Sequence, residues 1–232
     1  MGTLTRAQLI SQAGLASGND QTTAFVRTWL DAWLKRTAKS WAWPVLKVRI
    51  ADLPIAASAV SVDVGNGTFT AHYLHRIFNP LFFRTSDYKQ RGRIFIRELL
   101  DGNPDKDETL VQASDRLGAP STVKIRKKVG SLGVFTLFPD PAPDKAYLLS
   151  LDCHYVPASL AADSSVPWYE SDRTLLQACK CALLEYDDGG EGGQAYDKEM
   201  QKLAAMVIDD RDFDGEGPGD NVTMGLDKSV FV

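Results

Sequence analysis

The segment that decides the fold runs from Leu137 to Tyr186 and reads LFPDPAPDKAYLLSLDCHYVPASLAADSSVPWYESDRTLLQACKCALLEY. It opens with a proline-studded turn and continues into a run, Tyr147–Tyr155, in which apolar residues recur at every second position. After Pro167-Trp168 the apolar residues recur with the period of a helix. A period of two predicts a strand and a period near 3.6 predicts an amphipathic helix. The segment therefore marks the change from a β region to a helical region.

Two helices are predicted at the other end of the chain. Thr5 and Gln8 fit the capping box of a short first helix. A second helix carries an aromatic residue every four positions, at Phe25, Trp29 and Trp33. Its other face carries three charged residues at i, i+4 spacing that favours ion pairs along the helix, namely Arg27, Asp31 and Lys35.

Between Val45 and about Pro157 the apolar period changes to two, which predicts several short antiparallel strands. The Asn-Gly pair inside Gly65–Thr68 predicts a hairpin, and Gly130–Gly133 predicts a second one. The proline-rich stretch Pro139–Asp144 turns the chain into the next strand. Less regular segments are expected at Asn79–Arg93 and Asp101–Pro120.

Helical periodicity returns near the C-terminus, where Ser171 can cap a helix that ends at a glycine-rich stop. A further helix follows, and beyond Asp209 the sequence has neither periodicity nor enough apolar mass to fold alone. We therefore predict an α+β protein. It has a discontinuous N- and C-terminal helical bundle, an inserted antiparallel β domain, and an extended C-terminal arm that is acidic and flexible. The predicted ranges are 1–44 and 158–208 for the bundle, 45–157 for the β domain and 209–232 for the arm. The expected bundle core is Phe25, Trp29, Trp33, Trp168, Leu175 and Leu183.

Composition is that of an ordinary globular protein kept in a cytosol, with 44% hydrophobic and 24% charged residues and no apolar run long enough for a membrane span. The net charge of -4 hides an asymmetry, because residues 1–157 carry net +6 and residues 158–232 carry net -10. A chain with one positive and one negative part suits head-to-tail contact with copies of itself, although a merely solvated surface explains it equally well. The three cysteines lie inside apolar patterns, so we expect buried thiols.

No catalytic or cofactor signature is complete, and we expect no enzyme activity and no cofactor. His154 stands beside Asp152 and Cys153, but adjacent residues of a strand alternate faces and cannot converge as nucleophile, base and orienting group. A weak calcium candidate is the alternating trio Asp210, Asp212 and Asp214, for which a solvated acidic linker is the alternative. The twelfth position of that loop is Asn221 where a bidentate Glu is needed.

Two further features suggest binding. Lys124, Arg126 and Lys128 would share one face of a strand, which could meet DNA phosphates or an acidic protein, or simply face solvent. No aromatic residue interleaves with this cluster in the sequence. The chain ends in apolar residues on an acidic, glycine-rich arm, which suggests docking into a partner's groove or folding back on its own chain; these residues are Met224, Leu226, Val230, Phe231 and Val232.

The opening segment resembles a pattern in bacteriophage head-to-tail adaptor proteins, the connectors that attach to the portal of tailed phages. That pattern is a proline turn, an alternating strand, a loop with small residues and Asp, then Pro-Trp and a helix. The matching positions here are Leu137, Pro139, Pro141, Tyr155, Pro157, Leu160, Asp163, Pro167 and Trp168. The helices predicted before Pro44 are similar too, so the resemblance covers 1–45 and 130–208.

The resemblance implies a structural virion protein at the head-tail junction, made in the bacterial host cytoplasm. It implies a ring, dodecameric like the portal, that joins capsid to tail and extends the DNA channel. The implied partners are the portal protein, tail or nozzle proteins, further copies of the chain, and the DNA that passes through, with no membrane. In related connectors a C-terminal arm reaches the portal, which suits Met224–Val232. The alternatives are a tail-side completion protein and a calcium-dependent binding module.

Overall fold

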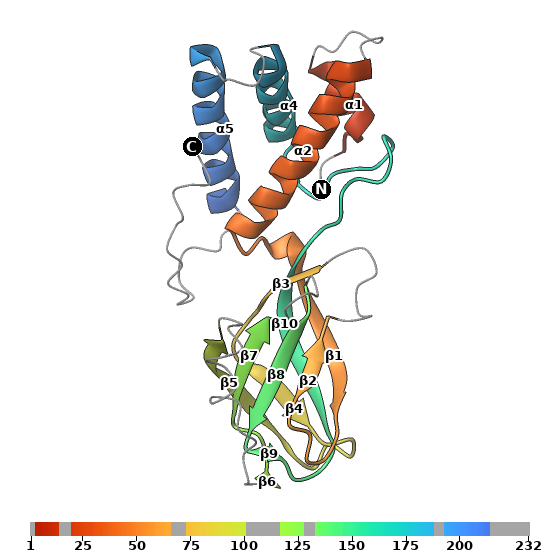
Figure 1. Ribbon diagram of the computed structural model, residues 1–232, viewed down its shortest axis with the longest axis vertical. Coiled ribbons are helices and arrows are strands. Elements are labelled where there is room, and N and C mark those ends of the chain that lie inside the picture. The colour runs from red at the N-terminus through yellow and green to blue at the C-terminus, as the bar shows by residue number, and fades with distance from the viewer. Residues whose placement is uncertain are drawn as a thin grey trace. The chain divides into compact units, whose positions relative to one another are not determined.

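The computed structural model describes residues 3–13, 20–65, 73–100, 117–127, 133–187 and 193–213. These residues form two compact units (Figure 1). The helical unit combines the described parts of Met1–Val45 and Ala158–Val232, and the β unit comprises those of Leu46–Pro157. Both ends of the described chain therefore belong to the same unit.

The helical unit contains α1 (Arg6–Gln12), α2 (Asp20–Ser40), α4 (Asp172–Asp187) and α5 (Gln194–Phe213). Helix α4 packs against each of the other three (Figure 1). Thr5 caps α1 through the predicted capping box with Gln8, and the Oγ of Ser171 accepts a hydrogen bond from the backbone N–H of Thr174 at the start of α4. Helix α5 continues through Asp209–Phe213, so these residues are helical and do not belong to an extended arm.

The core of the helical unit is built from the apolar faces that the sequence indicated. Trp29, Trp33 and Leu175 are buried, whereas Phe25, Trp168 and Leu183 are half-buried. The ring of Phe25 packs against Tyr186, with 5.4 Å between ring centroids. Two thiols of α4, Cys179 and Cys181, are fully buried.

The β unit begins after a 3-10 turn at Pro44–Leu46. Its strands are β1 (Lys47–Ile55), β2 (Val62–Val64), β3 (Tyr73–Ile77), β4 (Leu81–Arg84), β5 (Arg91–Leu100), β6 (Leu117–Gly118), β7 (Thr122–Lys127), β8 (Phe135–Asp140), β9 (Ala142–Pro143) and β10 (Tyr147–Val156). An 8-stranded sheet has the order β1-β10-β4-β5-β7-β8-β2, with β3 also paired to β10. The sheet curls until it is nearly closed, and β6 pairs separately with β9 (Figure 1).

Strand β10 is the hub of this unit because it pairs with β1, β3 and β4. Its alternation places Tyr147, Leu149, Leu151 and Cys153 in one buried cluster. The opposite strands contribute the rest of that cluster, including Leu81, Ile94, Ile125 and Leu137.

The predicted fold class, a helical bundle with an inserted antiparallel β domain, is wrong. The described chain is a mixed α/β fold that consists of four α-helices and a large, nearly closed sheet. The sheet is mixed, because β5 pairs with β7 in parallel and β6 pairs with β9 in parallel. A period of two identifies a strand but does not encode its direction, and a long connection permits a parallel crossover.

Strand neighbours also differ from the hairpin predictions. Strands β2 and β3 flank the Asn-Gly pair, yet β2 pairs with β8 and β3 pairs with β10. The segment Asn79–Arg93, expected to be irregular, contains β4 and the start of β5. The hairpin predicted around Gly130–Gly133 is confirmed in that β7 and β8 pair antiparallel.

Candidate functional site

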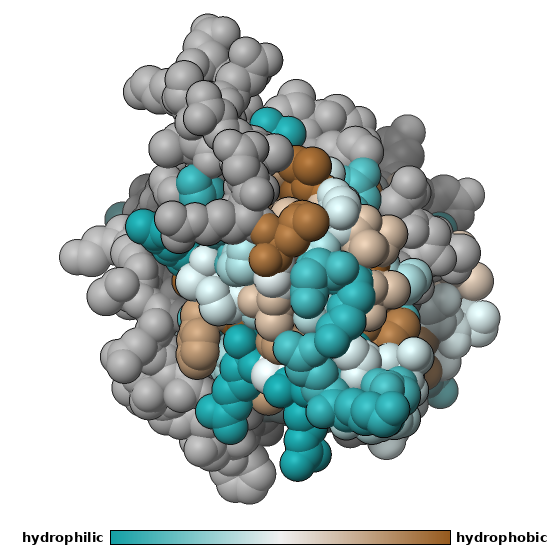
Figure 2. Space-filling model, turned by 90° about the horizontal axis from the view of Figure 1, so that it is seen from below, coloured by the Kyte–Doolittle hydropathy of each residue, from teal (hydrophilic) through white to brown (hydrophobic). Residues whose placement is uncertain are grey.

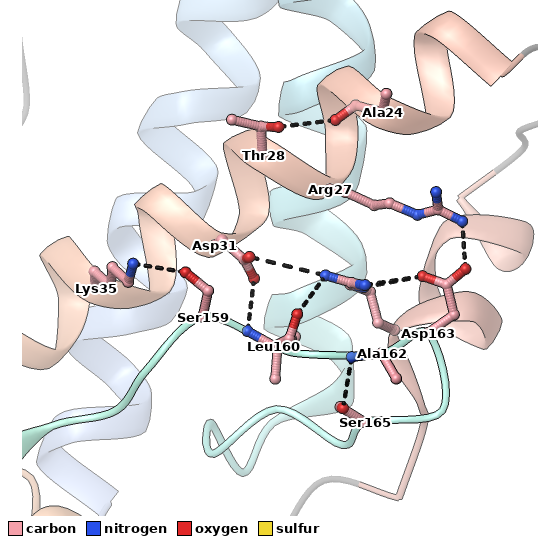
Figure 3. A network of polar contacts seen from close by, with 11 residues as sticks. Ala24, Arg27, Thr28, Asp31, Lys35, Ser159, Leu160, Ala162, Asp163 and Ser165 are labelled. Atoms are coloured by element: carbon pink, nitrogen blue, oxygen red, sulfur yellow. Dashed lines mark hydrogen bonds and ion pairs between the residues drawn. The ribbon is translucent and has the colours of Figure 1, made fainter. Parts of the chain in front are cut away.

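The loop between β10 and α4, which contains four of the nine positions that match the adaptor pattern, is bound by side chains of α1 and α2 (Figure 3). We call it the Asp163 loop, residues 158–171. The Asp163 carboxylate accepts a hydrogen bond from Arg6 Nε at 3.1 Å and forms ion pairs with the guanidinium groups of Arg6 and Arg27. The Arg6 side chain is only 9% exposed, so its charge depends on these partners.

A second set of contacts fixes the loop backbone next to Asp163. Arg6 Nη1 donates to the carbonyl of Leu160 at 3.0 Å, and the Asp31 carboxylate accepts a longer bond, 3.4 Å, from the backbone N–H of Leu160. Lys35 Nζ donates to the Ser159 hydroxyl at 2.7 Å (Figure 3). The three charged residues of α2 that were expected to pair along the helix bind the loop instead.

Helix α1 also binds the C-terminal part of the chain through its backbone. The N–H groups of Arg6 and Ala7 donate to the carbonyls of Ser165 and Asp163, at 2.9 and 3.0 Å. At the start of α4, Asp172 accepts hydrogen bonds from the backbone and hydroxyl of Thr3. Burial opposes ionisation of Asp172, but the bonds from Thr3 outweigh it, and the pKa of this carboxyl lies below its usual value.

The other end of the Asp163 loop is held by aromatic packing. Trp43 lies edge-on to both Trp168 and Tyr169, with centroids 5.7 and 5.3 Å apart, and Tyr169 also contacts Trp33. The Tyr169 hydroxyl donates to Asp210 near the end of α5 at 3.0 Å. Through this loop the residues before Pro44 and both C-terminal helices become one packed unit.

The positions that match the adaptor pattern therefore have a structural role that the sequence alone did not assign. Leu160, Asp163 and Trp168 anchor the loop, and among the described residues none of them is arranged with a nucleophile or a general base. What this arrangement can do chemically is hold a loop in one geometry. The anchoring residues Arg6 and Arg27 were missed; the spacing of Arg27, Asp31 and Lys35 on one face was the available signal.

The calcium candidate is divided by the end of α5. Asp210 lies within the helix and accepts hydrogen bonds from Tyr169 and Thr174, the latter at 2.6 Å. Asp212 is also helical, and Asp214 lies outside the described residues. The arm residues Met224, Leu226, Val230, Phe231 and Val232 lie outside them as well, as does Lys128.

An open groove runs between α4 and α5. The groove is lined by three apolar residues, by Gln177 and by three cations; the apolar residues are Leu176, Ala205 and Met206, and the cations are Arg173, Lys180 and Lys202. Lys202 forms an ion pair with Glu199 on the same helix. The groove is a surface of the helical unit on which an apolar, acidic segment could dock.

The residues of the enzyme alternative do not form a reactive centre. Asp152 forms an ion pair with Arg49 at 2.7 Å, whereas Cys153 and His154 are buried. Burial raises the pKa of the Cys153 thiol to about 12, so it stays protonated and unreactive. Burial raises the pKa of Cys179 to about 12 and that of Cys181 to about 11 in the same way.

Because His154 is buried, we predict that the stability of the β unit depends on pH. Burial, aided by the neighbouring charges of His75, Arg76 and Lys47, lowers its pKa to about 3, while its unfolded value is 6.5. The unfolded chain therefore binds a proton that the folded chain excludes, so stability is full above pH 6.5 and falls as the pH decreases toward 3. We expect the β unit to lose about 2 kcal/mol between pH 7.5 and 5.

Urea unfolding followed by far-UV circular dichroism at the two pH values measures this loss. The matched variant is His154→Phe, which keeps an aromatic ring at this position and does not titrate. The pH-dependent loss should shrink by most of its value in that variant. An unchanged loss in His154→Phe would assign the effect to other groups.

Among the described residues no group of three His, Cys, Asp or Glu side chains could hold a metal ion. None of the helices in the described ranges is long and apolar enough to span a bilayer. No protein-family model matches the chain, and no curated protein matches it significantly.

Proposed function

We propose that this chain is a bacteriophage head-to-tail adaptor, a non-enzymatic virion protein that forms a ring on the portal vertex and extends the DNA channel toward the tail. The observation that supports it is the Asp163 loop. Three of the nine positions that match the adaptor pattern, Leu160, Asp163 and Trp168, hold the loop that precedes α4 against residues of α1, α2 and Trp43. A motif with that mechanical role fits a protein whose task is to hold a shape.

The proposal gives each part of the chain a role. The apolar residues Met224–Val232 end an acidic arm that docks on the portal. The opposite net charges of residues 1–157 and 158–232 favour contact between unlike surfaces of neighbouring copies, which is how a closed heterologous ring is built. Ring size follows the resemblance alone, which implies twelve copies.

The test is native mass spectrometry of the purified chain mixed with the portal protein from the same genome. The full chain is expected to form a ring on the portal. A chain ending at Phe213 keeps the contacts of Asp210 and is expected to bind the portal at least tenfold more weakly. A full-length control replaces Met224, Leu226 and Phe231 with serine, which keeps the length and charge of the arm.

The outcomes separate the candidates. If both arm variants still form a ring on the portal, the adaptor function stands and the portal contact is assigned to the helical unit, where the groove between α4 and α5 offers a surface. A persistent monomer that ignores the portal contradicts the proposal. In that case a complex with tail-tube or nozzle proteins would favour the tail-side completion protein instead.

A further inference from the structure

One face of the β unit concentrates positive charge on three neighbouring strands, β4, β5 and β7. Along β5 the exposed positions alternate with the core positions and are Arg91, Arg93, Phe95 and Arg97. The described side chains of these three strands include no carboxylate, and Glu98 is the single acidic residue in their sequences. We call this surface the β5 face.

The strand register brings further cations to the β5 face. Arg84 of β4 lies opposite Arg91, and β7, the neighbour on the other side, presents Lys124 and Arg126. Arg84 forms an ion pair with Asp52 at 2.8 Å. Arg91 and Arg97 have no ion pair or side-chain hydrogen bond with any other described residue. Among the described residues, therefore, nothing occupies the donors of these two guanidinium groups.

Aromatic rings interleave with these cations. The Phe82 ring lies between Arg49 and Arg93, each with its guanidinium carbon 5.9 Å from the centroid. Arg126 lies 5.2 Å from the Phe138 centroid, and Arg84 lies 4.0 Å from that of Tyr88. Phe95 remains 50% exposed between Arg93 and Arg97. The sequence around Lys124 showed no such interleaving, because the rings come from neighbouring strands.

The excess of positive charge is confined to the β unit. Residues 46–157 carry 15 Lys and Arg against 12 Asp and Glu, whereas the rest of the chain carries 11 against 18. Figure 2 views the β unit from the end that carries β6 and β9, where hydrophilic residues gather around small hydrophobic patches. The acidic net charge of the whole chain thus conceals a basic, aromatic surface.

We propose that the β5 face binds single-stranded nucleic acid. Arginine forks match phosphate oxygens with two hydrogen bonds, and arginines stacked on rings are held ready to make them. An exposed ring flanked by arginines on a strand offers a stacking surface for an unpaired base, since every base has a π face. An acidic protein would use the arginines but would leave Phe95 without a role. This inference does not depend on the adaptor proposal.

The test is fluorescence anisotropy of the full chain with a labelled oligothymidine of about 20 nucleotides and a duplex of equal length. The single strand is expected to bind more tightly than the duplex, and binding should weaken steeply with salt. Replacing Arg91 and Arg97 with glutamine removes no described contact, so folding is preserved. That pair should weaken binding at least tenfold and lower the salt slope by about 0.7 for each lost phosphate contact.

Two further variants make the result specific. Phe95→Ala should weaken single-strand binding about five- to tenfold with an unchanged salt slope, because an unpaired base loses its stacking partner while no phosphate contact changes. Lys180→Gln with Lys202→Gln removes two charges from the helical unit and should leave binding unchanged. Equal losses in this control and in the arginine pair would overturn the proposal. A wild-type chain that binds neither oligonucleotide would also overturn it. So would equal affinity for the single strand and the duplex together with no effect of Phe95→Ala. The same holds if the arginine variants lose binding to an acidic protein but not to the oligothymidine.

Discussion

Replacement of Asp163 with alanine is expected to destabilise the helical unit by about 3 kcal/mol, the lower end of the range for breaking a buried ion pair. The carboxylate neutralises Arg6, whose side chain is 9% exposed, and it also binds Arg27. Without it, Arg6 keeps the Leu160 carbonyl and a more distant contact with Asp31 at 3.8 Å. Asp163 is itself 41% exposed, which is why the lower end is chosen.

Tryptophan fluorescence measures this loss selectively. The chain has five tryptophans, Trp29, Trp33, Trp41, Trp43 and Trp168, and all belong to the helical unit. Urea unfolding followed by their emission therefore reports that unit. The control is Asp209→Ala, an exposed carboxylate near the end of α5, which should change stability by less than about 0.5 kcal/mol. If Asp163→Ala behaved like this control, the loop would not be the anchor described above.

Replacement of Leu151 with alanine is expected to destabilise the β unit by about 3 kcal/mol, within the range for Leu→Ala in a core. Leu151 is fully buried in the middle of β10, the strand that pairs with β1, β3 and β4. The cavity would open where these strands meet, and a backbone already fixed by several neighbours cannot collapse to fill it.

The matched control is Leu148→Ala on the same strand, because Leu148 is half-buried and points to the opposite face. It should cost less than about 1 kcal/mol. Far-UV circular dichroism at the strand minimum follows both variants, since no tryptophan lies in this unit. Equal losses at the two positions would contradict the inward direction of Leu151.

Local signals in the sequence located the helices but not every helix end. The capping box at Thr5 and Gln8 starts α1 as predicted, because both partners lie within one turn. The aromatic spacing of Phe25, Trp29 and Trp33 marks one face of α2, because a period near four defines a face. The helical region was predicted to end at residue 208, because the apolar periodicity fades there. Helix α5 in fact continues to Phe213.

The partners of charged residues could not be predicted. Arg27, Asp31 and Lys35 have the spacing for pairs along a helix, yet they bind a loop more than a hundred residues later. Long-range contacts of this kind depend on which segments the fold brings together, and the spacing of residues within one segment does not encode its distant partners. The same limit hid the rings beside Arg93 and Arg126, which come from other strands.

The sequence by itself determined where most helices and strands occur, because side-chain periodicity is a property of neighbouring residues, although it missed β4 and the start of β5. It also determined that the thiols would be buried and that the charge would divide between two parts of the chain. Only the tertiary structure decided that β5 and β7 run in parallel, that β10 is the central strand, and that Asp163, in the loop before α4, binds Arg6 and Arg27. Pairing direction and ion-pair partners are set by the packing of distant segments, which local patterns do not encode.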